Sequence, residues 1–350
     1  MKNNLKEIMK PAPINGGFAM EGYWIWCGSV IKGEEGLYHM FASRWPKTYP
    51  MHPAWLIASE IVRAVSEKPE GPYEFAEVVL GQRSARYWDG KSVHNPFIMK
   101  CGDTYVLYYM GTTHPFIDLG MPGMLTIQDP RTIVARSNKR IGMATSKSIY
   151  GPWTRMDQPI LSVRPQYFDN YLVSNPAPCQ GENGEILMLY KARGYAEPAR
   201  NGYTFGNMQL GVVRAEQYNS KYEQLVNHPI NICEGMEVED PFLWKDEDGY
   251  NMMAKDMTGD ICGEKYGGIH ALSEDGIHWE VKKNNIFYSR KVLWSDGAVR
   301  EVGNMERPFI LFEDGKPICA FFATSDGKDG KGIINCTKTW NMAIPLNEYK

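Results

Sequence analysis

The chain has 350 residues, a formal net charge of −3, 43% hydrophobic residues and 12% aromatic residues. This composition can supply a sizeable core, and its near-neutral charge provides no basic surface for nucleic acid or an anionic membrane. No run of 18 apolar residues occurs that could span a bilayer.

The cysteines and the N-terminal stretch bear on the cellular compartment. The seven cysteines form no C-x-x-C pair, and several lie within apolar stretches, which favours reduced, buried thiols over a disulfide framework. Residues 1–13 contain no apolar region typical of a signal peptide. We therefore expect a cytoplasmic protein, or a periplasmic or secreted one if a leader has been removed.

A frame of a short apolar strand, an acidic or glycine-bearing turn and a second apolar strand recurs five times. The paired strands are expected at 27–32 and 37–41, 95–100 and 104–109, 175–179 and 186–190, 239–245 and the residues after 249, and 307–312 and 318–322. The copies are anchored near residues 28, 96, 176, 241 and 308, and the last four anchors are prolines. Each short turn predicts a β-hairpin, and the spacing of about 70 residues accounts for the whole chain.

Further strands follow most of the hairpins. Third strands are expected at 61–66, 141–146, 210–215 and 269–273, each followed by a turn and an aromatic residue that begins a fourth, outer strand. We predict an all-β fold, a five-bladed β-propeller with four antiparallel strands per blade, and no long helix. Residues 14–350 would form this single domain after an N-terminal tail of residues 1–13; an irregular β-sandwich is the alternative.

The connections between the second and third strands are the long ones. They span 43–56, 111–139, 193–207 and 255–266, whereas the turns between the first and second strands have three to five residues. Long loops in a compact domain usually build a binding site. The pocket is therefore expected on the face where the first strands begin.

Polar residues gather at the strand ends that reach this face. The substrate-binding candidates are His94, Asn95, Asn175, Asp240, Glu306, Arg307, Arg44, Arg193, Asp256 and His114. Such a ring of carboxylates, amides, histidines and arginines suits a neutral, hydroxyl-rich ligand. Acid/base chemistry on that ligand needs a carboxylic acid of raised pKa and a second, ionised carboxylate, and these are expected on different blades.

The residue-proline strand starts, the Gly-Pro-Tyr and Gly-Pro-Trp turns and the fivefold period resemble the five-bladed propeller glycoside hydrolases of families 43 and 117, over residues 15–345. The family 43 resemblance implies that Glu239, two residues before Pro241, is the general acid. The aspartates that this family places before proline in blades one and three are replaced by Cys27 and Asn175. The base therefore stays open, with Asp89 and Glu21 as candidates, and the histidine acid of family 117 keeps His94 and His114 as alternatives.

The resemblance implies a glycoside hydrolase that acts on a glycan or oligosaccharide, with an exo-acting, inverting mechanism. A glycoside phosphorylase, with Arg44, Lys191, Arg193 and Arg307 holding phosphate, and a catalytically inactive carbohydrate-binding propeller are the alternatives. No cofactor is required. A structural Ca²⁺ near the axis is the one metal left open, although no EF-hand spacing is present. The sequence does not specify the sugar, the linkage or the oligomeric state.

Overall fold

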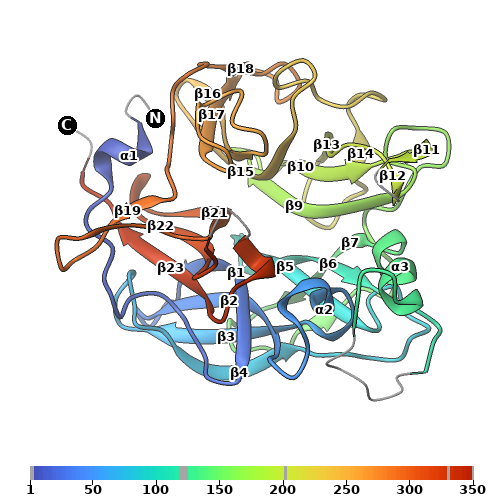
Figure 1. The fold of residues 1–350 in the computed structure, drawn as a ribbon, viewed down its shortest axis with the longest axis horizontal. Coiled ribbons are helices and arrows are strands. Elements are labelled where there is room, and N and C mark those ends of the chain that lie inside the picture. Colours follow the sequence, from blue (N-terminus) through green and yellow to red (C-terminus); the bar gives the residue numbers. More distant parts are fainter. Residues whose placement is uncertain (1–3, 118–124, 201–202, 329–331, 349–350) are drawn as a thin grey trace.

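The computed structural model describes residues 4–117, 125–200, 203–328 and 332–348. Five antiparallel sheets follow one another around a ring in chain order (Figure 1). The first four contain β1 (Tyr23–Lys32), β2 (Tyr38–Pro46), β3 (Glu60–Ser66) and β4 (Glu74–Leu80); β5 (Ser92–Cys101), β6 (Thr104–Thr112), β7 (Arg140–Ser146) and β8 (Thr154–Arg155); β9 (Leu172–Gln180), β10 (Ile186–Arg193), β13 (Gln209–Ala215) and β14 (Glu223–Gln224); and β15 (Val238–Asp246), β16 (Gly249–Asp256), β17 (Gly268–Ser273) and β18 (Glu280–Val281). The predicted five-bladed β-propeller is confirmed.

The fifth blade closes the ring with the help of the N-terminal segment. It contains β21 (Asn304–Glu313), β22 (Lys316–Ser325) and β23 (Thr339–Pro345). At the outer edge of β23, Phe18 and Asn341 exchange backbone hydrogen bonds of 2.9 Å. The segment expected as a tail contains the short helix α1 (Leu5–Ile8), and Leu5, Ile8 and Ala12 are buried in the core. The described N-terminal segment therefore packs against this blade.

A β-bulge interrupts the innermost strand of every blade. In β1, for example, Trp26 faces Ser43 and Ser29 faces Phe41, so two residues lie opposite one; the other four inner strands shift register at the matching place. The first bulged residue always has a left-handed backbone, with φ of 50–58° at Cys27, Asn95, Asn175, Asp240 and Arg307. Proline, which follows four of these residues, is tolerated because a bulge leaves a residue unpaired. The bulges give these five side chains equivalent places in their blades.

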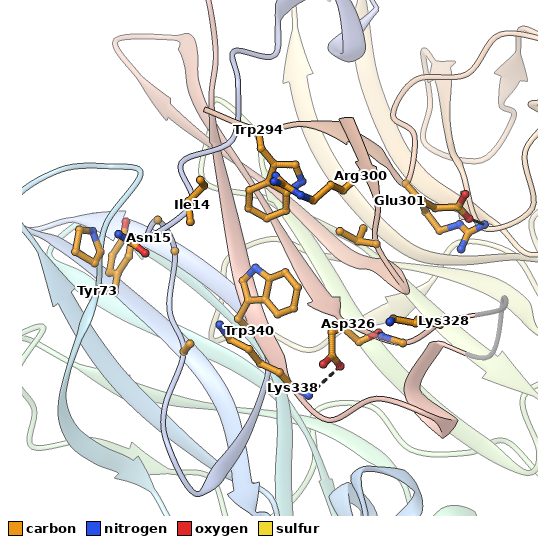
Figure 2. Close-up of a pocket in the computed structure, with 18 residues that line it drawn as sticks. Ile14, Asn15, Tyr73, Trp294, Arg300, Glu301, Asp326, Lys328, Lys338 and Trp340 are labelled. Atoms are coloured by element: carbon orange, nitrogen blue, oxygen red, sulfur yellow. Dashed lines mark hydrogen bonds and ion pairs between the residues drawn. The ribbon is translucent and has the colours of Figure 1, made fainter. Parts of the chain in front are cut away.

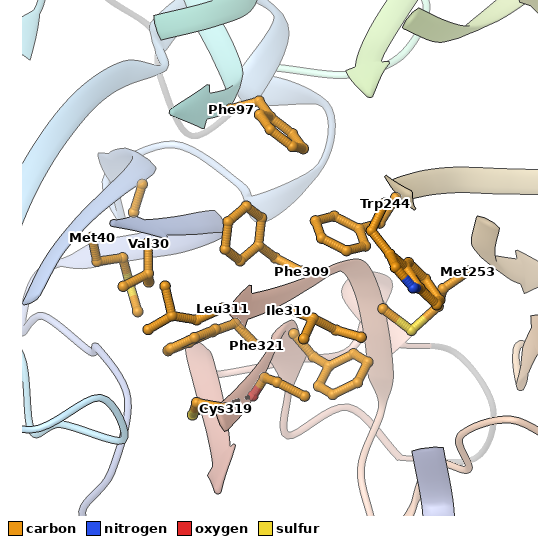
Figure 3. Packing of buried hydrophobic residues seen from close by; sticks show 14 of the residues in the cluster. Val30, Met40, Phe97, Trp244, Met253, Phe309, Ile310, Leu311, Cys319 and Phe321 are labelled. Carbon is orange, nitrogen blue, oxygen red and sulfur yellow. Dashed lines mark hydrogen bonds between the residues drawn. The ribbon is translucent and has the colours of Figure 1, made fainter. Parts of the chain in front are cut away.

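Beyond the bulges, aromatic rings fill the axis. Phe97, Phe242 and Phe309 come two residues after three of the bulged positions, and their ring centroids lie 5.1–6.0 Å apart. Figure 3 shows Phe97 and Phe309 in the main hydrophobic cluster, where their rings meet edge to face. Edge-to-face and offset contacts at such distances are favourable. These rings close the axis with apolar side chains on the side of the bulges away from the strand starts.

The long connections contain structure that was not predicted. The loop after β2 forms α2 (Met51–Ala58), the loop after β6 forms α3 (Pro130–Ser137), and the loop after β10 forms the hairpin of β11 (Tyr195–Arg200) and β12 (Tyr203–Phe205). A second hairpin, β19 (Lys291–Leu293) and β20 (Val299–Glu301), precedes the fifth blade, and a single 3-10 turn covers Gly332–Ile334. Within the described ranges, no helix is long and apolar enough to cross a membrane.

Candidate active site

A cavity of about 430 Å³ opens at the axis on the face where the inner strands begin. Its floor comes from the bulged residues Asn95, Asn175, Asp240 and Arg307. Its walls come from the long loops and their helices, with Met51, His52 and Trp55 from α2, Arg136 and Lys139 at the end of α3, and Met257 and Tyr266 from the loop after β16. The cavity therefore lies where the loop lengths placed the pocket.

Hydrogen bonds link the five bulged residues around the axis, through side chains at four of them and through the backbone N–H of Arg307. The Cys27 thiol donates to Asn95 Oδ1 (2.7 Å), and Asn95 Nδ2 donates to Asn175 Oδ1 (2.7 Å). Asn175 Nδ2 donates to Asp240 Oδ1 (2.6 Å), and the backbone N–H of Arg307 donates to Asp240 Oδ2 (3.1 Å). Because buried amides satisfied in this way are rigid, the ring fixes the floor of the cavity. Burial raises the pKa of the Cys27 thiol well above its ordinary value, so this member of the ring is a neutral donor.

Two glutamates share one buried lysine beside this ring. Lys255 Nζ lies 2.9 Å from Glu239 Oε2, 2.9 Å from Glu306 Oε1 and 3.6 Å from Asp240 Oδ2, and its side chain is 2% exposed. Glu239 also forms an ion pair with Lys191. Because both oxygens lie 2.9 Å from the same nitrogen, Glu239 Oε2 and Glu306 Oε1 are at most 5.8 Å apart.

The pKa values of the two glutamates are shifted in opposite directions. Burial acts to raise the pKa of both carboxyls, but Lys191 and Lys255 together hold the pKa of Glu239 well below its usual value. At Glu306 burial prevails over Lys255, and the charges of Asp240 and Glu239 add to it, so its pKa is raised. Two carboxyl groups whose surroundings push their pKa values apart are the signature of an acid/base pair.

An aromatic wall flanks the carboxylates. The Trp55 ring stacks on His94 with centroids 5.1 Å apart, and the Lys139 ammonium lies 4.3 Å from the Trp55 centroid. His94 receives or donates a 2.9 Å hydrogen bond at Nδ1 with Ser59 Oγ. Burial, then the charges of Lys139 and Arg307, lower the pKa of His94 well below its ordinary value, so its imidazole is neutral at pH 7.

The structure brings seven of the thirteen predicted site residues together. Glu239, His94, Asn95, Asn175, Asp240, Glu306 and Arg307 all line the axial cavity. Their common feature is position, since each lies at a bulge or directly before one.

Asp89, a candidate base, lies outside this cavity in a buried ion-pair cluster. Its carboxylate accepts from Arg83 Nε (2.5 Å) and from the Tyr109 hydroxyl (2.8 Å) and is fully buried. Blade three repeats this cluster, because Asp169 accepts from Arg164 Nε (2.9 Å) and from the Tyr190 hydroxyl (2.9 Å). A cluster that recurs at equivalent places in two blades is accounted for by architecture, so we do not assign Asp89 to the site.

The remaining five candidates also lie away from the cavity lining. Glu21 is exposed in a turn. Arg44 pairs with Glu60 (2.7 Å), and Arg193 donates to the Gly206 carbonyl and lies over Phe205. The Asp256 carboxylate accepts from several backbone N–H groups of its own loop, including those of Gly259 and Ile261 (both 2.8 Å). His114 is buried and stacks on Phe116. For the four residues other than Glu21, these contacts belong to a loop or blade rather than to the axial cavity.

Several cavity residues escaped the sequence analysis as site candidates. Lys139, Arg136, His52 and Trp55 belong to the irregular loops, where no repeat indicates which side chains turn inward. Lys255 is the lysine of β16 and directly precedes the predicted Asp256. Because side chains alternate along a strand, Lys255 points into the cavity and Asp256 points away from it.

A second, larger cavity of about 1010 Å³ lies at the seam between the N-terminal segment and the fifth blade. Figure 2 shows Trp294 and Trp340 on its walls, with Arg300 and Lys338 nearby. Its acidic residues are already engaged, since Glu301 pairs with Arg290 (2.8 Å) and Asp326 accepts from Thr337 and Lys338. No complementary acid/base pair like that of the axial cavity is present among its described lining residues.

Metal binding has no obvious place in the described ranges. No group of three or more histidine, cysteine, aspartate or glutamate side chains there is arranged to hold an ion. Near the axis, Asp240 already faces the cationic groups of Lys255 (3.6 Å) and Arg307 (3.7 Å).

Comparisons with known proteins bear on the fold. No family model matches the sequence, and no curated protein does either. Among solved structures, similarity extends over almost the whole chain. The fold is that of the five-bladed propeller glycoside hydrolases. A structure described simply as a glycoside hydrolase has a TM-score of 0.67 at 14% identity and covers 97% of this chain and 92% of its own.

Two further neighbours have more specific glycosidase descriptions. A family 117 glycoside hydrolase from the marine bacterium Zobellia galactanivorans has a TM-score of 0.64 at 15% identity, over 99% of this chain and 91% of its own. A thermostable family 43 glycoside hydrolase has a TM-score of 0.61 at 15% identity, over 98% of this chain and 93% of its own. The resemblance to these two families is thus confirmed at the level of the shared architecture.

Proposed function

We propose that the chain hydrolyses a glycosidic bond of a glycan or oligosaccharide in the axial cavity. The observation that carries this proposal is the Glu239–Glu306 pair, because its two carboxyls have opposite pKa shifts within one cavity. Glycoside hydrolysis needs such a pair, one carboxylic acid to protonate the leaving oxygen and one ionised carboxylate. The shared fold with glycoside hydrolases supports the same reaction class.

Within this pair, we assign the acid to Glu306 and the ionised carboxylate to Glu239. The family 43 resemblance favoured Glu239 as the acid, but two lysines stabilise its charged form. Glu306, with the raised pKa, is the better proton donor at neutral pH. Lys255 lies between the two carboxyl groups, so a bound substrate must displace its ammonium or bind beside it while it still contacts Glu239 and Glu306.

The spacing of the pair bears on stereochemistry. Inverting enzymes hold their carboxyls about 6.5–9.5 Å apart to admit a water, and retaining enzymes about 5–5.5 Å apart. The upper limit of 5.8 Å between Glu239 Oε2 and Glu306 Oε1 favours retention, with Glu239 as nucleophile, over the inversion expected from the sequence. Proton NMR of the first-formed anomer tests this assignment, and an inverted product would require a base outside the pair.

The size of the cavity supports action at a chain end. At about 430 Å³ it lies near the lower end of the range for small-molecule sites, and the loops that carry α2 and α3 form walls around it. We propose exo-acting release of a terminal residue. Release of monosaccharide alone from a defined oligosaccharide is the expected result, and internal cleavage products would contradict it.

The experiment for the reaction itself is hydrolysis of a panel of aryl glycosides and oligosaccharides. We expect turnover by the unaltered chain and a loss of more than about a thousandfold in Glu239→Gln and Glu306→Gln. Glu247→Gln, in an exposed turn, is the matched control and should keep full activity. Equal activity in all three variants would refute the site.

Phosphorolysis is a second candidate because basic side chains line the cavity beside the pair. Turnover that depends on inorganic phosphate and yields a sugar phosphate would favour it. Glycan binding without turnover under either condition would favour a carbohydrate-binding propeller.

We also propose a reducing compartment, the cytoplasm, as the site of action. All seven cysteines are free thiols, and five of them are buried, as in proteins that rely on no disulfide. Cell fractionation would test this, and recovery from an oxidising compartment would contradict it.

A further inference from the structure

The charges that line the axial cavity do not balance. Five basic side chains face it, Arg136, Lys139, Lys191, Lys255 and Arg307, against three carboxylates, Glu239, Asp240 and Glu306. By formal charge, with His52 and His94 counted as neutral because burial lowers the pKa of both, the described lining has two more basic than acidic side chains. A lining that is formally positive favours a ligand that carries negative charge over a neutral one.

Each of the three carboxylates of the lining pairs with a basic group other than Lys139. Glu239 pairs with Lys191 and Lys255, and Glu306 pairs with Lys255. Asp240 receives the backbone N–H of Arg307 at 3.1 Å and lies 3.7 Å from its guanidinium. Lys139, which lies just after α3 on one side of the cavity, pairs with none of these carboxylates.

Lys139 is a buried basic side chain with no acidic partner among the described residues. Its residue is only 3% exposed, and within the described part of the chain its ammonium has neither an ion pair nor a side-chain hydrogen bond. The ammonium lies over the Trp55 face at 4.3 Å, and such a face attracts a cation but does not neutralise it. A buried cation is ordinarily paired, because desolvation without compensation is costly.

Three of the four charged groups that act on Lys139 are positive. Burial, followed by the charges of Lys191 and Arg136, lowers its pKa well below the ordinary lysine value, and Glu239 offsets this only in part. An anion bound beside it would restore the charged form and gain an ion pair in a water-poor site. Among the described residues no acidic side chain pairs with Lys139, so the cavity is suited to a ligand that places a negative group beside it.

We propose that Lys139, with Arg136 beside it, forms an anion subsite that selects a negatively charged group in the reaction of the axial cavity. The group is the carboxylate of a sugar acid at the end of the substrate or a free inorganic phosphate. This proposal rests on the proposed function for its substrate class, and it replaces the neutral ligand expected from the sequence. Lys139 acts in binding and specificity, not in proton transfer.

The test compares matched pairs of glycosides that differ only in the anionic group. Aryl glucosides and galactosides, in both anomeric forms, are assayed beside the corresponding glucuronides and galacturonides, with and without inorganic phosphate. We expect a uronide to be preferred over its neutral partner, and Lys139→Met to lower the ratio of the two kcat/KM values at least tenfold. Lys221→Met, which removes an equally charged but exposed side chain (83% exposed), should leave the preference intact.

The result also identifies the source of the anion. A neutral glycoside consumed only with phosphate, with a phosphate KM raised in Lys139→Met, assigns the subsite to free phosphate. A preference for neutral glycosides that is independent of phosphate and unchanged in Lys139→Met would overturn the proposal.

A binding measurement separates this proposal from the proposed function. Titration calorimetry with glucuronate, galacturonate, glucose and inorganic phosphate needs no turnover. If no glycoside is cleaved but a uronate or phosphate binds and Lys139→Met weakens it tenfold, the anion subsite stands while the hydrolase assignment falls. If neither anion binds more tightly than glucose, the anion subsite is refuted whatever the activity. Circular dichroism and thermal melting confirm that the variant is folded.

Discussion

Lys255→Met should destabilise the protein because Lys255 is the shared counter-charge of the candidate active site. Its ammonium lies 2.9 Å from both Glu239 and Glu306, and its side chain is 2% exposed. Removing one partner of a buried ion pair costs about 3–5 kcal/mol because the other charge is left uncompensated. Glu239 keeps Lys191 and Asp240 keeps Arg307, so we expect the lower end, about 3 kcal/mol.

The loss should depend on pH in a defined direction. Lys255 lowers the pKa of Glu306, which burial raises; without the lysine, that pKa rises further. The folded variant then binds a proton that the unfolded chain does not bind at neutral pH, so its stability deficit shrinks as the pH falls toward 5. At low pH a protonated Glu306 no longer needs the cation.

Urea denaturation of the unaltered chain and the variant at pH 8 and pH 5 measures both effects. Lys245→Met, which removes an exposed lysine from β15, is the matched control and should change the free energy of unfolding by less than about 0.5 kcal/mol. A deficit below about 1 kcal/mol for Lys255→Met, or one that is the same at both pH values, would refute the electrostatic reasoning.

Three further outcomes follow from the ionisation states. Activity should fall as the pH rises through the raised pKa of Glu306, because the acid then loses its proton. The lowered pKa of Glu239 keeps that carboxylate ionised at acidic pH. A pH–rate profile without a decrease at alkaline pH would contradict this assignment. Lys139→Met should raise the melting temperature, by a stability gain of about 1 kcal/mol. Because its lowered pKa means that the folded chain binds fewer protons than the unfolded one, the gain should be larger at pH 6 than at pH 9, and equal gains would count against an unpaired cation. The Cys27 thiol, 2% exposed and with its pKa raised well above normal by burial, should resist iodoacetamide at pH 8 in the native protein and react after unfolding; mass spectrometry of labelled peptides decides this.

The architecture could be predicted because it repeats. The predicted third strand at 61–66 agrees with β3 (Glu60–Ser66) within one residue, and the other third strands agree as closely. Proline at four of the five anchors was interpreted as a strand start, but the inner strands begin three or four residues earlier. Each proline is instead the second residue of a bulge, where it breaks no ladder hydrogen bond. Asparagine and aspartate, which accept the left-handed backbone more readily than most residues, occupy three of the five bulged positions.

The site was predictable only where it belongs to the repeat. Glu239 and Glu306 precede equivalent bulges, so their convergence followed from the fold. Lys255 faces Glu239 across the β15–β16 hairpin of one blade, but its contact with Glu306 joins two blades, which no local pattern encodes. Asp89 seemed distinctive in the sequence, yet Asp169 shares its arginine and tyrosine partners.

The part of the site that lies on the loops could not be predicted from the sequence. Their lengths indicated the face of the pocket, but Lys139 and Trp55 lie on segments without periodicity that could show their direction. The charge of the ligand was therefore inferred from the strand ends alone, which suggested a neutral sugar, and the unpaired lysine that alters this inference became visible only in three dimensions.

The most direct test of the account is a crystal structure of Glu306→Gln with a bound oligosaccharide that the unaltered chain cleaves. The account predicts the terminal sugar in the axial cavity, with the scissile oxygen within hydrogen-bonding distance of the residue 306 side chain and Glu239 facing the anomeric carbon. A sugar bound instead in the cavity beside Trp294 and Trp340, with the axial cavity empty, would contradict it.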